Sequence, residues 1–360
     1  MGCKVKGNPP AIIDGLKHTL VNHPRFSSIL EMNNGKKGKP SWVRTEVRVE
    51  DHVIVPDIDP NIESPDQYLE DYISKLTTVP MDFSKPLWEI HLLCLKTSNA
   101  ESIGLLKIHH SLGDGMSLMS LFLACTRKTS DPEALPTVSV QKNSLDRAVT
   151  PVFSTRFDQE ATPKSKESMR KFRLRSAIMI NLRPNTGIEA LADMMAKKSK
   201  CRWGNLFGYI LLPFSVGLET DPLEYVRRAK VTVNRKKHSL EAVFSMAFFK
   251  LILKVLGLKA SVVLVRKVIH NTTLTFSNVV GPKEEITFHG HPLSYIAPSV
   301  FGHPHALTVH FQSYEKKVII SVTADPTVIP DPHKMCDDFV ESLKLIKSSV
   351  LERGLYEMEV

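Results

Sequence analysis

The feature that most constrains the fold is a change in sequence character between Thr126 and Ser176. Serine, threonine, proline and charged residues dominate this segment, as in "KTSDPEALPTVSVQK" near its start and "DQEATPKSKESMRK" near its end. Such a composition is typical of an exposed connection rather than of a packed element. The 360 residues are also enough for one large or two medium domains. We therefore predict two halves, residues 1–130 and 177–360, joined by a linker or crossover at 131–176.

Both halves mix helical and strand patterns. In the first half, apolar spacing predicts helices over 10–22, 68–76 and 116–128, and strands over 41–55, 88–95 and 102–108. In the second half it predicts helices over 240–256, ended by Gly257, and 332–350, with strands over 174–184, 272–282, 306–314 and 317–325. This mixture predicts an α/β or α+β sandwich of two related lobes.

Charge and cysteine content narrow the class of protein. The net charge of +9 favours anionic partners, but the basic residues are scattered and form no stripe with interleaved aromatics, so nucleic acid is not expected. The five cysteines are widely spaced with no C-x-x-C, which indicates reduced thiols in a cytosol-facing protein. The apolar stretch Leu206–Leu218 is too short to cross a bilayer and contains Pro213, so we expect it to be buried or to lie in a membrane interface.

The stretch "KIHHSLGDGMSL" (107–118) places two adjacent histidines where an apolar strand pattern gives way to a glycine-flanked turn. One interpretation is a polar surface loop. The other is a catalytic base, because a neutral imidazole at a strand end can take a proton from an alcohol, with a rate effect of about 10²–10⁴. Asp114 would then orient the ring or pair with an arginine that holds the loop. Gly113 and Gly115 permit a tight turn and close approach of the backbone.

Other chemical motifs are missing from the sequence. It contains no G-x-S-x-G, no P-loop and no G-x-G-x-x-G, so neither a serine nucleophile nor a nucleotide-binding loop of these kinds is predicted. The pairs His289/His291 and His303/His305 have the spacing of strand neighbours. No carboxylate or cysteine cluster accompanies them, so we predict no metal site.

Three ordered motifs carry a resemblance to a known family. The H-H-x-x-x-D-G of residues 109–115 resembles the signature of the CoA-dependent acyltransferase superfamily. "PLWEIHLL" (86–93) and "SNVVGP" (277–282) resemble motifs of the plant wax ester synthase/diacylglycerol acyltransferase family, and "HPRF" (23–26), "NLRP" (181–184) and the "HFQSY…VTAD…IPDP" tail are also similar to it. The resemblance covers most of the chain, and the order of the motifs makes it specific.

The resemblance implies a two-lobed, chloramphenicol acetyltransferase-like fold with a tunnel between the lobes. It implies that His110 is the general base, with His109 as a packed neighbour and Asp114 and Gly115 shaping the loop. Ser277, Asn278 and Gly281 would line the tunnel, where Asn278 either donates a hydrogen bond to the oxyanion or caps a turn. The motif-support residues would be Pro86, Leu87, Trp88 and Glu89.

The implied reaction moves a fatty acyl group from acyl-CoA, a co-substrate rather than a bound cofactor, to a long-chain alcohol or diacylglycerol. A phenolic or amine acceptor is a related alternative. The implied location is the endoplasmic reticulum or plasma membrane, peripheral and cytosol-facing, or else the cytoplasm. The sequence lacks the family's N-terminal P-x-S-x-x-x-R-x-F stretch, its long central hydrophobic segment and the S/T-I-N-D-V-V-L helix start. The rival interpretation is therefore a truncated, non-catalytic lipid- or CoA-binding member or partner subunit.

Overall fold

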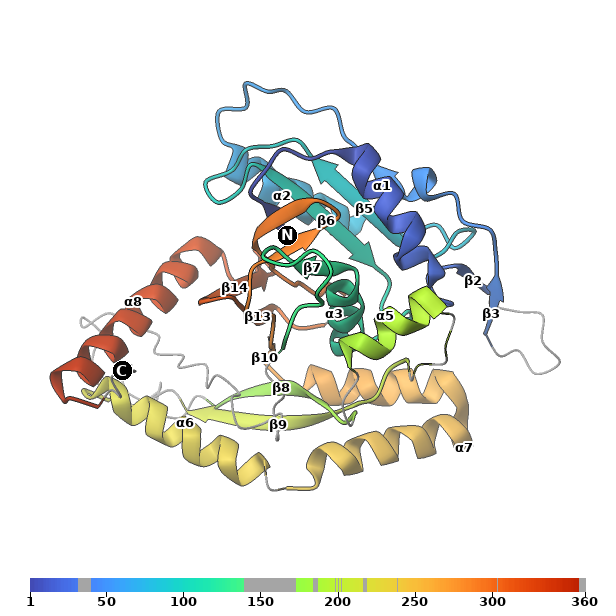
Figure 1. The fold of residues 1–360 in the computed structure, drawn as a ribbon. Helices are drawn as coiled ribbons and strands as arrows, with labels where there is room; N and C mark the ends of the chain where they lie inside the picture. The colour runs from blue at the N-terminus through green and yellow to red at the C-terminus, as the bar shows by residue number, and fades with distance from the viewer. Residues whose placement is uncertain are drawn as a thin grey trace.

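Two large β-sheets organise the chain (Figure 1). The computed structural model describes residues 1–31, 40–138, 173–183, 187–197, 199, 201, 203–215, 219–237, 239–302 and 304–355. Most of the predicted linker, including 146–166, where the family's long central hydrophobic segment is missing from the sequence, lies outside these residues. The division of the chain at 130 and 176 therefore stays a prediction.

The first sheet has seven strands in the order β4-β5-β6-β1-β12-β11-β7. Its strands are β1 (Gly2–Cys3), β4 (Val53–Ile54), β5 (Trp88–Leu93), β6 (Ser102–Ile108), β7 (Thr126–Lys128), β11 (Ile286–Phe288) and β12 (His291–Tyr295). The helices of this half are α1 (Pro9–His18), α2 (Pro65–Thr78) and α3 (Gly115–Ala124), with 3₁₀ turns at Leu20–Asn22 and Val49–His52. Strands β11 and β12 come from the second half of the chain, so the chain crosses back into this sheet.

The second sheet has five strands in the order β14-β13-β10-β8-β9. Its strands are β8 (Arg173–Asn181), β9 (Phe207–Ser215), β10 (Leu274–Val279), β13 (Leu307–Tyr314) and β14 (Lys317–Ala324). Helices α6 (Pro222–Lys237), α7 (Glu241–His270) and α8 (Pro332–Glu352) pack on this sheet. Helix α5 (Ile188–Lys197) instead packs against α3 in the core of the first sheet. A separate hairpin pairs β2 (Ser28–Glu31) with β3 (Ser41–Arg44).

The two faces of the second sheet differ in chemistry. Alternate side chains of a strand point to opposite faces. One face carries Phe276 and Phe311, which form an apolar core with residues of α6, α7 and α8. The other face carries the buried His310 and Gln312, and ends in Tyr314, which belongs to the core of the first sheet. The Tyr314 hydroxyl donates to the Leu293 carbonyl at 3.0 Å, so this polar face is turned toward the first sheet.

Most predicted elements are confirmed, one is corrected, and one open alternative is resolved. The predicted strand 41–55 is wrong as one element, because β3, a 3₁₀ turn and β4 occupy it. The helix predicted over 240–256 is confirmed as the first leg of α7 and stops at Gly257, whose φ of 77° is not helical; a second leg, 258–270, follows it. The stretch Leu206–Leu218 was expected either to be buried or to lie in a membrane interface. It contains β9, whose Ile210 and Leu212 are buried, which supports the first alternative.

Hydrogen bonds and core packing explain why β5 and β6 form where predicted. They pair antiparallel, with Trp88 opposite Ile108, and the turn between them is the polar "KTSNAE". Apolar residues of both strands pack against α1 and α3 in the first core. This pairing brings the end of β6, and the histidines that follow it, beside the start of β5. Among the described residues, no helix combines the length and apolar composition that crossing a bilayer requires.

Candidate active site

The motif loop, residues 109–114, connects β6 to α3 and is closed at both ends by backbone hydrogen bonds. The His109 amide donates to the Leu87 carbonyl at 3.0 Å, and the Leu112 amide donates to the His109 carbonyl at 3.0 Å. Helix α3 then begins at Gly115, and the Asp114 carboxylate caps it by accepting from the Ser117 amide at 2.9 Å. The aspartate of the motif is therefore a helix N-cap, a role for which its side chain is well suited.

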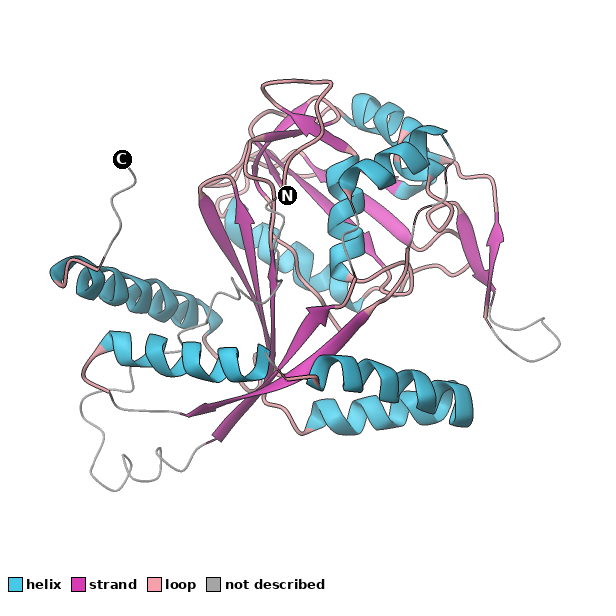
Figure 2. Cartoon of the chain, turned by 60° about the horizontal axis from the view of Figure 1, so that its bottom comes forward, coloured by secondary structure: helices cyan, strands magenta, loops and turns pink. Residues whose placement is uncertain are grey.

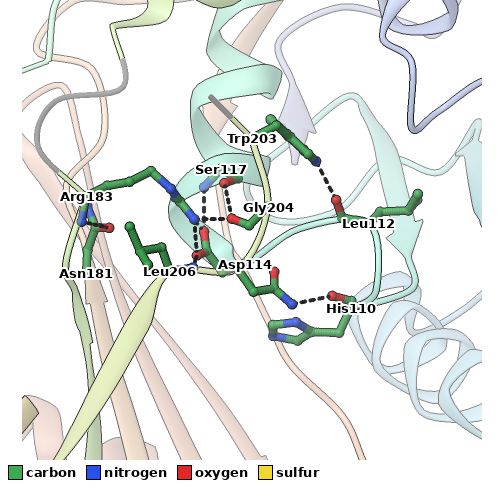
Figure 3. Close-up of polar contacts among 10 residues, drawn as sticks. His110, Leu112, Asp114, Ser117, Asn181, Arg183, Trp203, Gly204 and Leu206 are labelled. Carbon is green, nitrogen blue, oxygen red and sulfur yellow. Dashed lines mark hydrogen bonds and ion pairs between the residues drawn. The ribbon is translucent and has the colours of Figure 1, made fainter. Parts of the chain in front are cut away.

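His110 is the exposed residue of the loop. Its carbonyl oxygen accepts a hydrogen bond from the Asn205 side-chain amide at 3.4 Å, so the second half of the chain reaches its backbone. Figure 3 shows His110 at one end of the loop, with Asp114 and its partners at the other. The predicted base is thus not sealed in the core.

His109 is half-buried and held by its own turn. Its Nδ1 accepts from the Ser111 amide at 3.2 Å and lies 2.7 Å from the Ser111 hydroxyl. Its ring meets Phe83 edge-on, with centroids 5.6 Å apart. Burial and the neighbouring His110 lower the pKa of His109 below its ordinary value. Since Nδ1 is occupied as an acceptor, the contacts of His109 are those of a packed residue.

Asp114 is buried and saturated with hydrogen bonds. Both terminal nitrogens of the Arg183 guanidinium donate to the carboxylate, Nη1 at 3.0 Å and Nη2 at 2.5 Å. The Leu206 amide donates to Oδ2 at 2.9 Å. Burial raises the pKa of Asp114, but the hydrogen bonds from Arg183, Leu206 and Ser117 outweigh burial, so its pKa lies below the ordinary value. Of the two roles left open by the sequence, the geometry gives Asp114 the arginine pairing that holds the loop.

Arg183 and residues 203–206, called here the clamp, come from the second half of the chain. Arg183 Nη2 also donates to the Gly204 carbonyl, which accepts from the Ser117 hydroxyl at 3.2 Å. Trp203 Nε1 donates to the Leu112 carbonyl at 2.5 Å. The second half of the chain therefore contacts the motif loop at His110, Leu112 and Asp114, and it also contacts Ser117 in the first turn of α3 (Figure 3).

The clamp is itself seated on the "HPRF" stretch. The Trp203 ring lies 4.1 Å from the ring of His23 and 6.3 Å from that of Phe26, centroid to centroid. His23 is 1% exposed. Burial, with Arg25 and Arg44 nearby, lowers the pKa of His23 to about 3. His23 is therefore neutral; its Nδ1 accepts from the Arg25 amide at 3.1 Å, and its ring packs against Trp203.

The Pro86–Glu89 motif, which includes the start of β5, supports the beginning of the motif loop. Pro86, Leu87 and Trp88 are buried, and the Leu87 carbonyl holds the His109 amide. Trp88 is fully buried, stacks on His52 at 4.3 Å and donates from Nε1 to the Phe26 carbonyl at 2.8 Å. Glu89 faces Lys107, its cross-strand partner, at 3.7 Å.

The Ser277–Gly281 stretch ends β10 on the second sheet. Ser277 is in register with His310, on the polar face turned toward the first sheet, whereas Asn278 is in register with Phe311, on the face covered by helices. Gly281 packs so closely on β13 that a Cβ would overlap the Ser313 carbonyl. The alternation of β10 therefore separates the two polar side chains that the sequence grouped together.

Several of these contacts carried no signal in the sequence. Arg183 lies in "NLRP", which the family resemblance singled out as a motif without assigning the arginine a role. The Leu206 amide and the Gly204 carbonyl are backbone groups that any residue supplies. A small apolar cavity lies between α1, α3 and the strands β5 and β6, with Ile108 and Leu118 in its lining. Within the described part of the chain, no three His, Cys, Asp or Glu side chains gather as metal ligands.

Comparison with known proteins adds the family. Residues 5–195 match the wax ester synthase/diacylglycerol acyltransferase catalytic domain, and residues 203–347 match the WS/DGAT C-terminal domain. Wax ester synthase/diacylglycerol acyltransferase 11 of Arabidopsis thaliana is 67% identical over 452 aligned positions, which include 100% of this chain and 93% of that protein. Wax ester synthase/diacylglycerol acyltransferase 2 of the same plant is 42% identical over 446 positions, with coverage of 100% and 93%.

The first of these alignments is longer than the chain itself. It contains at least 92 positions, the difference between 452 and 360, at which this chain has no residue. Because the alignment includes the whole chain, these positions are internal.

Two solved structures are similar in fold. The wax ester synthase/diacylglycerol acyltransferase from Marinobacter aquaeolei VT8 superposes with a TM-score of 0.55 at 17% identity, covering 98% of this chain and 92% of that one. The first condensation domain of the CDA synthetase gives a TM-score of 0.53 at 11% identity, covering 96% and 89%. These likenesses confirm the predicted CoA-dependent acyltransferase fold, and the sequence matches show that the chain belongs to the wax ester synthase/diacylglycerol acyltransferase family.

Proposed function

We propose that this protein is an acyl-CoA-dependent O-acyltransferase in which His110 is the general base. Its acceptors are a long-chain alcohol, giving a wax ester, or diacylglycerol, giving a triacylglycerol. The observation that carries the proposal is an accessible imidazole on a loop whose other end is fixed by a buried ion pair. A base must meet the substrate while its backbone stays in place, and this loop supports both requirements.

The reaction needs one proton carrier. A ring nitrogen of His110 takes the proton from the acceptor hydroxyl as the hydroxyl oxygen attacks the thioester carbonyl. The tetrahedral intermediate then collapses, the C–S bond breaks, and the imidazolium returns its proton to the leaving CoA sulfur. No covalent enzyme intermediate is needed, because the acyl group arrives activated. Asp114 cannot replace His110 in this role, since both its oxygens are occupied by Arg183 and backbone amides.

The negative charge on the tetrahedral oxygen needs a hydrogen-bond donor. The sequence suggested Asn278, and it remains a candidate at the end of β10. The strand alternation favours the Ser277 hydroxyl, because Ser277 shares a face with His310 and Tyr314, which is turned toward the first sheet. Replacing Ser277 by Ala and Asn278 by Ala separately tests this choice: the true donor lowers kcat by about 10²–10³, and the other does not.

Acyl-CoA is proposed as a co-substrate, and the positive charge of the chain suits its phosphates. The proposed location is the cytosolic face of the endoplasmic reticulum or plasma membrane, where a lipid acceptor is available.

The direct test is CoA release by the purified protein. Acyl-CoA is incubated with a fatty alcohol or diacylglycerol, and free thiol is measured for the unchanged protein and for His110→Ala. We expect the variant to lose about 10²–10⁴ in rate. His18→Ala is a matched control, because His18 is an exposed helical histidine whose ring contacts only its own helix. Equal rates for the unchanged protein and His110→Ala would contradict the mechanism.

A second candidate is a non-catalytic acyl-CoA-binding member of the family. The internal positions that the chain lacks relative to its Arabidopsis relative favour it. Acyl-CoA binding with no CoA release for alcohol, diacylglycerol, phenolic and amine acceptors alike would support this candidate. Release with only the phenolic or amine acceptors would keep the mechanism and change the substrate.

A further inference from the structure

Helix α7 exposes large apolar side chains along its first leg and around its break. Positive φ at Gly257 divides it into legs of 241–256 and 258–270, each shorter than the roughly 20 residues that span a bilayer. The exposed apolar residues include Phe244 (67%), Phe248 (52%), Leu251 (55%), Val255 (67%), Leu256 (61%) and Leu258 (53%). Residues 244, 248, 251 and 255 follow the 3.6-residue period, so they form one outward stripe.

From residue 242 onward, the charged residues of α7 all have one sign; Glu241, at its start, is paired with Lys236. No aspartate or glutamate occurs between residues 242 and 270. The same segment carries five exposed basic residues, namely Lys250, Lys254, Lys259, Arg266 and Lys267. An apolar stripe on a helix whose charged residues after Glu241 are all basic is complementary to a surface that presents acyl chains beneath anionic headgroups.

The opposite side of the first leg is fixed to β9, so the apolar stripe cannot turn inward. The Ser245 hydroxyl accepts from the Tyr209 amide at 3.0 Å and lies 3.1 Å from the Tyr209 carbonyl. The Glu241 carboxylate accepts from the Leu211 amide at 2.8 Å. Gly208 lies so close to α7 that a Cβ there would overlap the Ala242 carbonyl.

The figures place α7 at the edge of the molecule. In Figure 1, α6 and α7 run along the bottom, on the side of the second sheet away from the first. Figure 2 turns this side forward, and no described element lies in front of the two legs of α7. The stripe is therefore an open face in the part of the chain that the structure describes.

We propose that α7 docks this protein in the interface of an anionic phospholipid bilayer. The stripe of residues 244–255 enters the headgroup boundary, and Lys250, Lys254 and Lys259 contact lipid phosphates. Docking itself does not depend on the proposed function. Only its consequence, the supply of a lipid acceptor to the site, rests on that function. Strand β9, on which α7 is fixed, begins directly after Leu206, whose amide holds Asp114. Docking through α7 therefore sets the orientation of the motif loop relative to the bilayer.

The first experiment measures binding of the full chain to vesicles by co-sedimentation. Vesicles of phosphatidylcholine alone are compared with vesicles containing about 30% phosphatidylserine. We expect binding to the anionic vesicles, weakened about tenfold or more by Phe248→Glu with Leu251→Glu, and also by Lys250→Glu with Lys254→Glu. Leu343→Glu on α8 is the matched control, because Leu343 is also 52% exposed but α8 carries Asp337, Asp338 and Glu341.

Three outcomes of this experiment overturn the proposal. One is equal binding of both α7 variants and the unchanged protein, and another is binding that ignores lipid charge. The third is that Phe248→Glu with Leu251→Glu changes the molar mass in light scattering while vesicle binding is retained, which would make α7 an interface between copies of this chain. The replaced side chains are exposed, so each variant is expected to fold. Circular dichroism and the thermal midpoint of each variant check this.

The second experiment separates docking from catalysis. CoA release is measured with the acceptor in vesicles and with the acceptor in detergent micelles. The α7 variants are expected to slow only the vesicle assay, whereas His110→Ala slows both and still binds vesicles. If the unchanged protein releases no CoA in either assay, the proposed function fails, but the sedimentation result still decides the docking proposal.

Discussion

The two ends of the motif loop are held in opposite ways. At the Asp114 end, a buried carboxylate meets a guanidinium and two backbone amides, and the side chains of the ion pair are 8% and 4% exposed. At the His110 end, the ring is exposed, and the backbone carbonyl accepts a hydrogen bond of 3.4 Å from Asn205 of the second half. The difference suggests a division of labour within six residues: one end fixes the loop between the two halves, and the other is left open to reactants.

The largest expected effect comes from breaking the ion pair. Asp114→Ala leaves Arg183 buried without its carboxylate and removes the cap of α3, so we expect a loss of about 3–5 kcal/mol in the free energy of unfolding. Urea denaturation measures it. The double variant Asp114→Leu with Arg183→Met removes both charges and should be less destabilised than Asp114→Ala. A loss below about 1 kcal/mol for Asp114→Ala would show that the loop does not depend on this contact.

The next effect tests the support under the clamp through pH. His23 has a pKa of about 3 in the folded protein, below its ordinary value, because burial and nearby Arg25 and Arg44 disfavour its charged form. Its neutral form therefore contributes full stability above about pH 6.5, and this contribution is lost as the pH falls toward 3. Between about pH 6.5 and 4 the loss is on the order of 3 kcal/mol.

The measurement is the free energy of unfolding from urea curves across this pH range. His23→Phe keeps a ring against Trp203 but removes the titration, so its stability should fall less steeply with acid. A part of the decline should persist, because His289, whose pKa is lowered to about 4 mainly by burial, titrates in the same range. Identical slopes for His23→Phe and the unchanged protein would show that His23 is not the buried neutral support of the clamp.

A smaller effect compares two motif glycines. Gly281→Ala places a Cβ against the Ser313 carbonyl, a backbone atom that cannot move aside easily, so we expect a loss of about 1–3 kcal/mol in stability. Gly115→Ala places its Cβ in open space at the first turn of α3, and its cost should be within about 0.5 kcal/mol. Thermal and urea unfolding of the two variants check the difference, and equal losses would contradict it.

The sequence was informative where periodicity or local chemistry determines structure. The strands β5, β6, β13 and β14 and the helix α8 were all predicted, and each is confirmed. The prediction for α7 correctly located the first leg and its end at Gly257, but it did not include the second leg, 258–270. The strand predicted at 41–55 failed because short alternation does not reveal a 3₁₀ turn at 49–52.

The site was predictable only in its local part. The sequence identified the motif loop and allowed Asp114 to pair with an arginine, but Arg183 is 69 residues away, and nothing in the local pattern selects it. The clamp at Gly204 and Leu206 acts through backbone atoms, which leave no residue signature. Similarly, β11 joins the first sheet by pairing with β7, some 160 residues earlier in the chain, a long-range contact that composition does not encode.

The smallest expected effect on stability belongs to the residue with the largest proposed effect on rate. His110→Ala removes an exposed ring and keeps the backbone carbonyl that Asn205 contacts, so the free energy of unfolding should change by no more than about 0.5 kcal/mol. Urea curves for His110→Ala and Asp114→Ala, measured together, therefore compare the two ends of the loop directly. A loss above about 1.5 kcal/mol for His110→Ala would show that the ring packs against the protein. A neutral result combined with a large loss of CoA release would assign His110 to chemistry and Asp114 to the scaffold, since a structural histidine cannot give that combination.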